Sequence, residues 1–152
     1  MILHEYFHSL LGPSSSRRTP INPEIIQLGN TLPVDLQLKM CSPFTDNNIK
    51  QEIFSIPNLK SPAPDGFSSG FFKSSWSITG PLVCNAVQHF FQTSQLPPFL
   101  GRTKLLLIPK VPSPTQAKDF RPISCCLVIY KCIAKFLCSR LKEVLPHLIH
   151  QS

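Results

Sequence analysis

The stretch KLLLIPKVPSPTQAKDFRPISCCLVIYKCIAKF, residues 104–136, decides the fold class. Residues 104–109 are nearly all apolar, which predicts a short buried strand. A polar loop follows, and residues 120–124 predict a second strand. A long helix then runs to Pro146, where its pattern stops. Strands and helices in this order indicate a helix-rich α+β chain.

The expected long helix has two different sides. One side is apolar and is formed by Tyr130, Ile133, Ala134, Leu137, Leu141 and Leu145. The other carries Lys131, Lys135 and Lys142. A cationic, amphipathic helix is a weak candidate for contact with nucleic acid, and a simple solvated face explains it equally well.

Upstream of this stretch, the sequence predicts further helices separated by proline-rich breaks. Residues 2–11 form the first helix, residues 14–18 a loop, and residues 20–44 loops and short helical turns. Thr45 or Asp46 can cap a helix that Pro57 stops. Its buried stripe consists of Ile49, Ile53 and Ile56.

Two prolines and a glycine within residues 60–66 predict a rigid turn. In that turn we interpret Asp65 as an acceptor for backbone amides. Pro81 is suited to the first position of the next helix, which Leu96-Pro97-Pro98 ends. The inner face of that helix is expected to consist of Leu82, Val83, Ala86, Val87, Phe90 and Phe91.

Charge is concentrated in the last third of the chain. The net charge is +7, and residues 101–152 carry nine basic side chains against Asp119 and Glu143. A one-sided basic segment favours a polyanionic partner such as nucleic acid or nucleotide phosphates. The six cysteines form no C-x-x-C pair, so we expect reduced, mostly buried thiols and no metal site. No secretory signal or membrane-spanning run is evident, and we expect an intracellular protein of the nucleus or cytoplasm.

Seven short motifs occur in a fixed order along the chain. They are Pro43-Phe44-Thr45, Ile49-Lys50-Gln51-Glu52-Ile53, Lys60-Ser61-Pro62-Ala63-Pro64-Asp65-Gly66-Phe67, Phe71-Phe72-Lys73-x-x-Trp76, Leu107-Ile108-Pro109-Lys110, Asp119-Phe120-Arg121-Pro122-Ile123-Ser124 and Tyr130-Lys131-x-Ile133. Together they resemble the start of the reverse transcriptase domain of LINE-type (non-LTR) retrotransposons. The sequence departs from that family at Ala63, where glycine is usual, and at Leu127, where asparagine is usual. An alanine at position 63 is expected to strain the turn.

The resemblance implies a partial right-hand polymerase fold, with the fingers and the start of the palm. Residues 1–42 would be the linker region that precedes the polymerase domain. Residues 43–152 would be the N-terminal part of that domain, truncated before the catalytic palm motifs. The implied partners are RNA, DNA and dNTP. The intact family enzyme uses Mg²⁺, and we expect this chain to bind no cofactor itself.

Two residues match family positions that grip the triphosphate of the incoming nucleotide, Lys110 and Arg121. A lysine offers a point charge and an arginine a planar fork, and both suit phosphate oxygens. The alternative for Arg121 is a local ion pair with Asp119. No catalytic residue is expected, because two-metal polymerisation needs converging carboxylates and no two acids of the chain lie within five residues of each other. The chain alone is therefore expected to be inactive.

Two other functions stay open. The motif His4-Glu5-Tyr6-Phe7-His8 fits H-E-x-x-H, in which two histidines one helical turn apart bind zinc in metalloproteases. Leu11 and Ser14 stand where a metzincin would need glycine and histidine, so this alternative is remote. The second alternative is a non-catalytic nucleic-acid-binding protein built on the basic last third.

Overall fold

The computed structural model describes residues 2–12, 20, 22–58 and 62–149. The chain divides into two compact units. Unit 1 comprises Met1–Gly29 and Leu105–Ile123, and unit 2 comprises Asn30–Lys104 and Ser124–Ser152. The described part is helix-rich with a two-stranded sheet, as the α+β prediction required. The predicted loop at 14–18 lies outside the described residues.

Unit 1 contains two helices and most of a two-stranded hairpin. The helices are α1 (Ile2–Leu11) and α2 (Pro23–Gln27), and most of strands β1 (Thr103–Pro109) and β2 (Phe120–Cys126) belongs to the same unit. The helix predicted at residues 2–11 is confirmed. Its backbone ends where the Gly12 amide donates to the His8 carbonyl at 2.8 Å, and Phe7 is its buried side chain.

Both predicted strands exist, but β1 is not the buried strand that its apolar run suggested. Leu105 and Ile108 are 44% and 45% exposed, and Ile123 of β2 is 43% exposed. An isolated pair of strands can cover only part of each face. The apolar run therefore reflects a surface that the described part of unit 1 leaves open.

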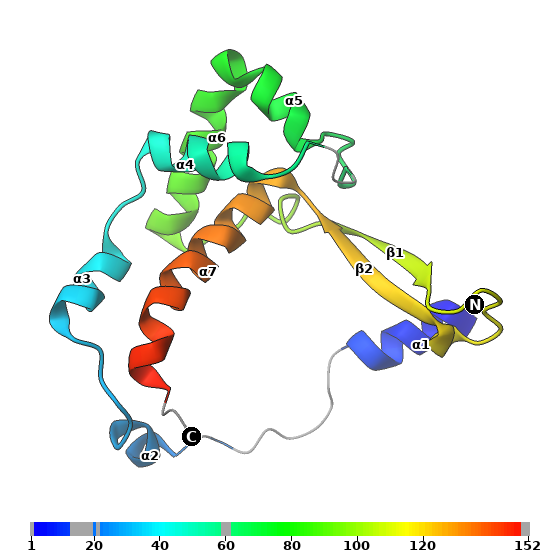
Figure 1. Cartoon of the computed structure of the whole chain (residues 1–152), viewed down its shortest axis with the longest axis horizontal. Helices are drawn as coiled ribbons and strands as arrows, with labels where there is room; N and C mark the ends of the chain where they lie inside the picture. The colour runs from blue at the N-terminus through cyan, green and yellow to red at the C-terminus, as the bar shows by residue number, and fades with distance from the viewer. Residues whose placement is uncertain (1, 13–19, 21, 59–61, 150–152) are drawn as a thin grey trace. The chain divides into compact units, whose positions relative to one another are not determined.

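Unit 2 has a core of four helices. They are α4 (Asp46–Ser55), α5 (Ser69–Ser74), α6 (Trp76–Thr93) and α7 (Val128–Leu148). Helix α4 contacts the other three, and α6 also contacts α7 (Figure 1). The predicted stripe of α4 is confirmed, since Ile49 and Ile53 are 0% exposed. Thr45 caps the helix: its Oγ1 accepts from the Asn48 amide at 3.2 Å, and its own amide donates to Asn48 Oδ1 at 3.1 Å.

Residues 20–44, where loops and short helical turns were expected, contain the short helix α2 and also, before α4, the two-turn helix α3 (Val34–Cys41). Its C-terminal end is attached to α7 by Arg140. The guanidinium donates to the carbonyls of Met40 and Ser42, and its Cζ lies 3.6 Å from the centre of the Phe44 ring. Burial lowers the pKa of Arg140. A planar, permanently charged group suits this combination of stacking and carbonyl contacts.

The turn after α4 has the predicted conformational role. Gly66 adopts φ +78°, and its amide donates to the Ala63 carbonyl at 3.0 Å. Asp65 Oδ1 accepts from the Phe67 amide at 3.1 Å. Among the described residues, Ser94 is the non-glycine residue with positive φ, so Ala63 does not adopt the strained backbone that we expected. Ala63 is instead buried, at 6% exposure.

Helix α6 begins at Trp76 rather than at Pro81, so the predicted start is wrong. Proline is tolerated in the first turn of a helix and is costly further inside, which made Pro81 look like a start. The residues before Pro81 nevertheless form the first turn of the helix. The Ser75 carbonyl accepts hydrogen bonds from the amides of Ile78 and Thr79, at 2.9 Å each. Leu82 is 70% exposed, whereas Cys84 is buried beside Val83 and Val87. Ser94 ends the helix in the left-handed region.

Helix α7 (Val128–Leu148) forms as predicted, but its buried residues only partly match the apolar side named from the sequence. Its buried residues are Val128, Cys132, Ile133, Phe136 and Val144. Of the apolar side named from the sequence, Ile133 is buried at 4% exposure and Ala134 is half-buried. Its other members, Tyr130, Leu137, Leu141 and Leu145, are 37–45% exposed. Apolar residues occupy more than one side of this helix, and both sets repeat at helical spacing, so periodicity could not choose between them. The helix also continues past Pro146 to Leu148.

The cysteines are partly as expected. Cys84, Cys125 and Cys132 are buried free thiols, while Cys41 and Cys138 are exposed. Burial raises the pKa of Cys132 to about 12, so this thiol stays protonated and unreactive in the folded chain.

Candidate functional site

The hairpin of unit 1 holds both predicted phosphate-binding residues. Lys110 directly follows β1, and its amide donates to the Asp119 carbonyl across the hairpin at 2.7 Å. Arg121 lies two positions beyond Asp119, in β2. Diagonal neighbours on an antiparallel pair are about 7–8 Å apart, within reach of long side chains. The backbone pairing therefore brings Lys110 and Arg121 to the same end of the hairpin.

The loop between the strands is held by internal hydrogen bonds. Asp119 Oδ2 accepts from the amides of Thr115 and Gln116 at 3.0 and 2.9 Å. Those two bonds, with smaller contributions from Lys118 and Lys110, lower the pKa of Asp119. The short helix η1 (Ala117–Asp119) completes the loop. Asp119 is thus an ionised residue that orders the loop through backbone amides.

Arg121 does not form the local ion pair with Asp119 that was the alternative explanation. The ion pairs of the described residues are Lys39–Glu143 and Lys135–Glu52. Arg121 is exposed, and in the part of the chain that the structure describes its guanidinium has no hydrogen bond. A fork of donors on a fixed strand, facing water, suits a bidentate contact with phosphate.

Lys110 is exposed but not free to move. Its Nζ donates to the Lys118 carbonyl at 2.7 Å, which draws the side chain over the loop. Lys118 itself is also exposed. Sequence reasoning missed Lys118, although its position one residue before Asp119 in the loop was a usable signal. The loop end of the described hairpin thus offers three cations, Lys110, Lys118 and Arg121, beside the carboxylate of Asp119, which is occupied by backbone amides.

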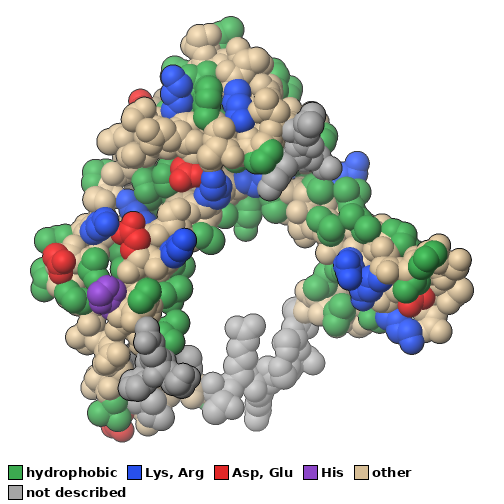
Figure 2. All heavy atoms as spheres, viewed as in Figure 1, with side chains coloured by type: hydrophobic (Ala, Val, Ile, Leu, Met, Phe, Trp, Pro, Cys, Tyr) green, Lys and Arg blue, Asp and Glu red, His purple; other side chains and the backbone are tan. Residues whose placement is uncertain are grey.

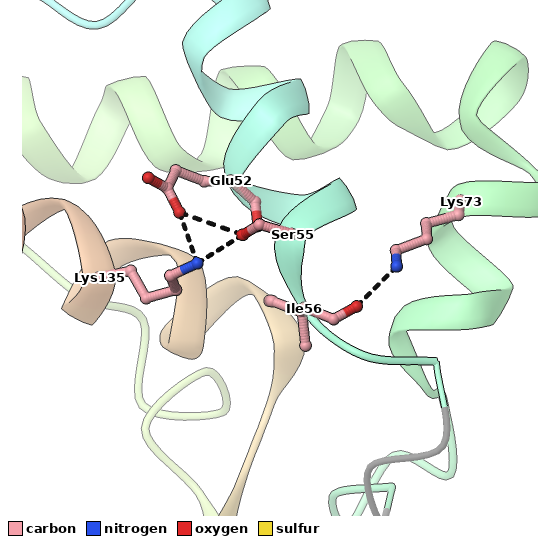
Figure 3. A network of polar contacts seen from close by, with 5 residues as sticks. All are labelled: Glu52, Ser55, Ile56, Lys73 and Lys135. Carbon is pink, nitrogen blue, oxygen red and sulfur yellow. Dashed lines mark hydrogen bonds and ion pairs between the residues drawn. The ribbon is translucent and has the colours of Figure 1, made fainter.

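The lysines of α7 belong to unit 2 and have different surroundings. Lys135 Nζ lies 2.8 Å from Glu52 Oε2 and also contacts Ser55 Oγ (Figure 3). Lys131 is half-buried, and Lys142 is exposed. Of the three lysines suggested for contact with nucleic acid, Lys135 is therefore paired within the chain, whereas Lys142 is exposed to solvent.

The histidines of the H-E-x-x-H motif lie one turn apart on α1, with ring centres 5.8 Å apart. The described residues contain no group of three or more His, Cys, Asp or Glu side chains that could hold a metal ion. Within the same residues, no helix is long and apolar enough to cross a membrane.

Comparison with known proteins gives one informative similarity. No family model matches the chain. Over 149 residues the chain is 31% identical to the Transposon TX1 uncharacterized 149 kDa protein of Xenopus laevis. The match covers 95% of this chain and 11% of the Xenopus protein, so the chain spans a small part of its relative's length. The relative is named as a transposon protein, which agrees with the coarser part of the resemblance.

Proposed function

We propose that the chain is the nucleotide-gripping fingers segment of a LINE-type reverse transcriptase, with Lys110 and Arg121 as contacts to the triphosphate of a dNTP. One observation carries this proposal: the backbone pairing brings two exposed basic residues, Lys110 and Arg121, to one end of the hairpin, while the local acid Asp119 is bound to backbone amides. The similarity to a transposon protein supports the same family.

The chemistry of the hairpin suits a polyphosphate. Hydrogen bonds from charged donors to phosphate oxygens are roughly twice as strong as neutral ones. The loop is already ordered by the Asp119 contacts, so binding does not have to order it again. Lys118 adds a third positive charge at the same loop, and we include it as a supporting contact. On α7, Lys131 and Lys142 stay as weaker candidates for nucleic acid.

We also propose that this chain binds nucleotide without extending a primer. Phosphoryl transfer by two metal ions needs carboxylates that converge on one point. The acids nearest in sequence are Asp46 and Glu52, and Glu52 is paired with Lys135. Any polymerase activity would then depend on a cluster of carboxylates that the described residues do not form.

The test measures dNTP binding by isothermal titration calorimetry for the wild-type chain, Arg121→Ala and the matched control Arg102→Ala. Arg102 is an exposed arginine before β1, so its loss removes the same charge elsewhere. Hydrogen bonds to charged groups contribute about 1.5–3 kcal/mol, so Arg121→Ala should weaken binding by about tenfold or more. Circular dichroism checks that both variants fold alike.

Primer extension on an RNA template with Mg²⁺ is recorded on the same samples. We expect no extension by any of them. Equal binding by wild type and Arg121→Ala would contradict the phosphate role. Extension by the wild-type chain would instead contradict the carboxylate argument and leave the binding role intact.

A further inference from the structure

Two histidines of α1 have no role in the proposed function. His4 and His8 are both exposed, and their ring centres lie 5.8 Å apart with planes that differ by 29°. Residues four positions apart on a helix are neighbours on its surface. The helix therefore presents two imidazoles together at one place, where solvent reaches both.

One metal ion can bridge the two rings. A zinc–nitrogen bond is about 2.0–2.1 Å long, so two such bonds together with the two ring radii span more than the distance between the ring centres. Because both side chains are exposed, rotation about their side-chain bonds can turn one nitrogen of each ring toward the same ion. Imidazole suits zinc, copper and nickel, whereas magnesium and calcium prefer oxygen ligands. The pair is thus selective for transition metals.

The surroundings of the two imidazoles favour a bound cation. Both rings line an open, largely apolar cavity of about 390 Å³ between α1 and β1, and all its lining residues belong to unit 1. Figure 2 shows hydrophobic side chains over the α1 and hairpin part of this unit. The described residues that line the cavity include no lysine or arginine that would repel a metal ion. Glu5, which is exposed and follows His4, adds negative charge to the helix.

We infer that His4 and His8 together bind one divalent transition-metal ion, such as Zn²⁺, which clamps α1 in its helical form. A helix of ten residues is marginal by itself. A bridge between side chains one turn apart requires that turn to be helical, so the bound ion stabilises α1.

The ion is structural rather than hydrolytic. Catalytic zinc takes three protein ligands and keeps one position for water or substrate. The described residues contain no group of three side chains that could supply such a set. The inference also stands apart from the triphosphate site, because imidazole nitrogens bind the metal there and Lys110 and Arg121 would bind phosphate oxygens. Arg121→Ala should therefore bind Zn²⁺ as the unchanged chain does.

The experiment measures Zn²⁺ binding by isothermal titration calorimetry at pH 7.5, without nucleotide, because phosphates chelate metals. The unchanged chain is compared with His4→Gln, His8→Gln and the matched control His89→Gln. His89 is exposed on α6 and has no histidine one turn away. All four chains also carry Cys41→Ser and Cys138→Ser, since exposed thiols bind zinc as well. Hydrogen exchange of the α1 amides, with and without Zn²⁺, is followed on the same chains by mass spectrometry.

We expect Zn²⁺ affinity to fall in both His4→Gln and His8→Gln, with His89→Gln close to the unchanged chain. Changes in groups that merely orient a metal ligand cost about 10–100-fold in affinity, so losing a ligand should cost at least about tenfold. Zn²⁺, but not Mg²⁺, should slow exchange of the α1 amides, including the Gly12 amide that donates to the His8 carbonyl at 2.8 Å. Unchanged affinity in either α1 variant, an equal loss in His89→Gln, or equal exchange with and without Zn²⁺ would overturn the inference.

Discussion

The contact between Gly80 and Trp76 in α6 leads to a quantitative prediction. A methyl group placed on Gly80 would lie 2.8 Å from Cε2 and 2.9 Å from Nε1 of Trp76. Such distances require the indole to move. We therefore predict that Gly80→Ala displaces the ring, and that the cost depends on whether residue 76 is tryptophan.

The magnitude follows from three contributions. Overpacking a filled site costs about 1–3 kcal/mol. Alanine is favoured over glycine inside a helix by about 1 kcal/mol, which offsets part of that cost. An alanine before Pro81 is also restricted in the helical region. The last two contributions do not involve the indole, so they cancel when Gly80→Ala is compared in Trp76 and Trp76→Leu backgrounds. The coupling between the two sites should then be about 1–3 kcal/mol.

The assay is urea unfolding of the four chains of this double-mutant cycle, followed by far-UV circular dichroism. Trp76 is the single tryptophan, so the intrinsic fluorescence of the Gly80→Ala variant reports the surroundings of the Trp76 indole directly. We expect its emission maximum to shift. A coupling within about 0.5 kcal/mol of zero would refute the reasoning, because distant independent sites give values of that size.

Two further predictions concern Arg140 and Asp119. Arg140→Lys should lower the free energy of unfolding by about 1–3 kcal/mol in urea, because lysine cannot reach both carbonyls while stacking on Phe44, whereas exposed Arg102→Lys should change it by less than about 0.5 kcal/mol. For Asp119 the folded pKa is lowered from 3.8 by backbone hydrogen bonds, so its stabilisation is present above that value and is lost as pH falls through the folded pKa. Asp119→Asn should flatten the dependence of stability on pH in acid, and an unaltered acid profile would contradict the assignment.

Local signals predicted several elements correctly. Thr45 before an apolar stripe predicted the start of α4, because a cap and a helical repeat lie within a few residues of each other. The hairpin strands followed from a short apolar run and a proline-bearing loop. The candidate residues Lys110 and Arg121 were identified from the resemblance of their motifs to the family. Their closeness could also have been predicted, because the two expected strands are adjacent in sequence and can pair as a hairpin.

The remaining features depend on contacts between distant parts of the chain. Lys135 was a weak candidate for contact with nucleic acid, and its ion pair with Glu52 had no local signal, because Glu52 stands on α4, far away in sequence. The choice of which apolar side of α7 meets the α4 core also depends on such contacts, because helical spacing does not distinguish the sides. The exposure of Phe67 and Phe71 also escaped prediction, because a list of aromatic residues does not say which rings stay exposed.

The pairing of α4 with α7 has a consequence for the order of events during protein synthesis. The Lys135–Ser55 contact spans 80 residues, and the contact of Arg140 with Met40 spans 100. At about 5–20 residues per second, a ribosome needs on the order of 4–20 s to make the chain between such partners. Throughout that interval, Ile49 and Ile53 of the nascent chain lack the helix that later covers them. The folding of unit 2 must therefore wait for α7 to emerge, and until then the half-made core is a natural binding site for chaperones.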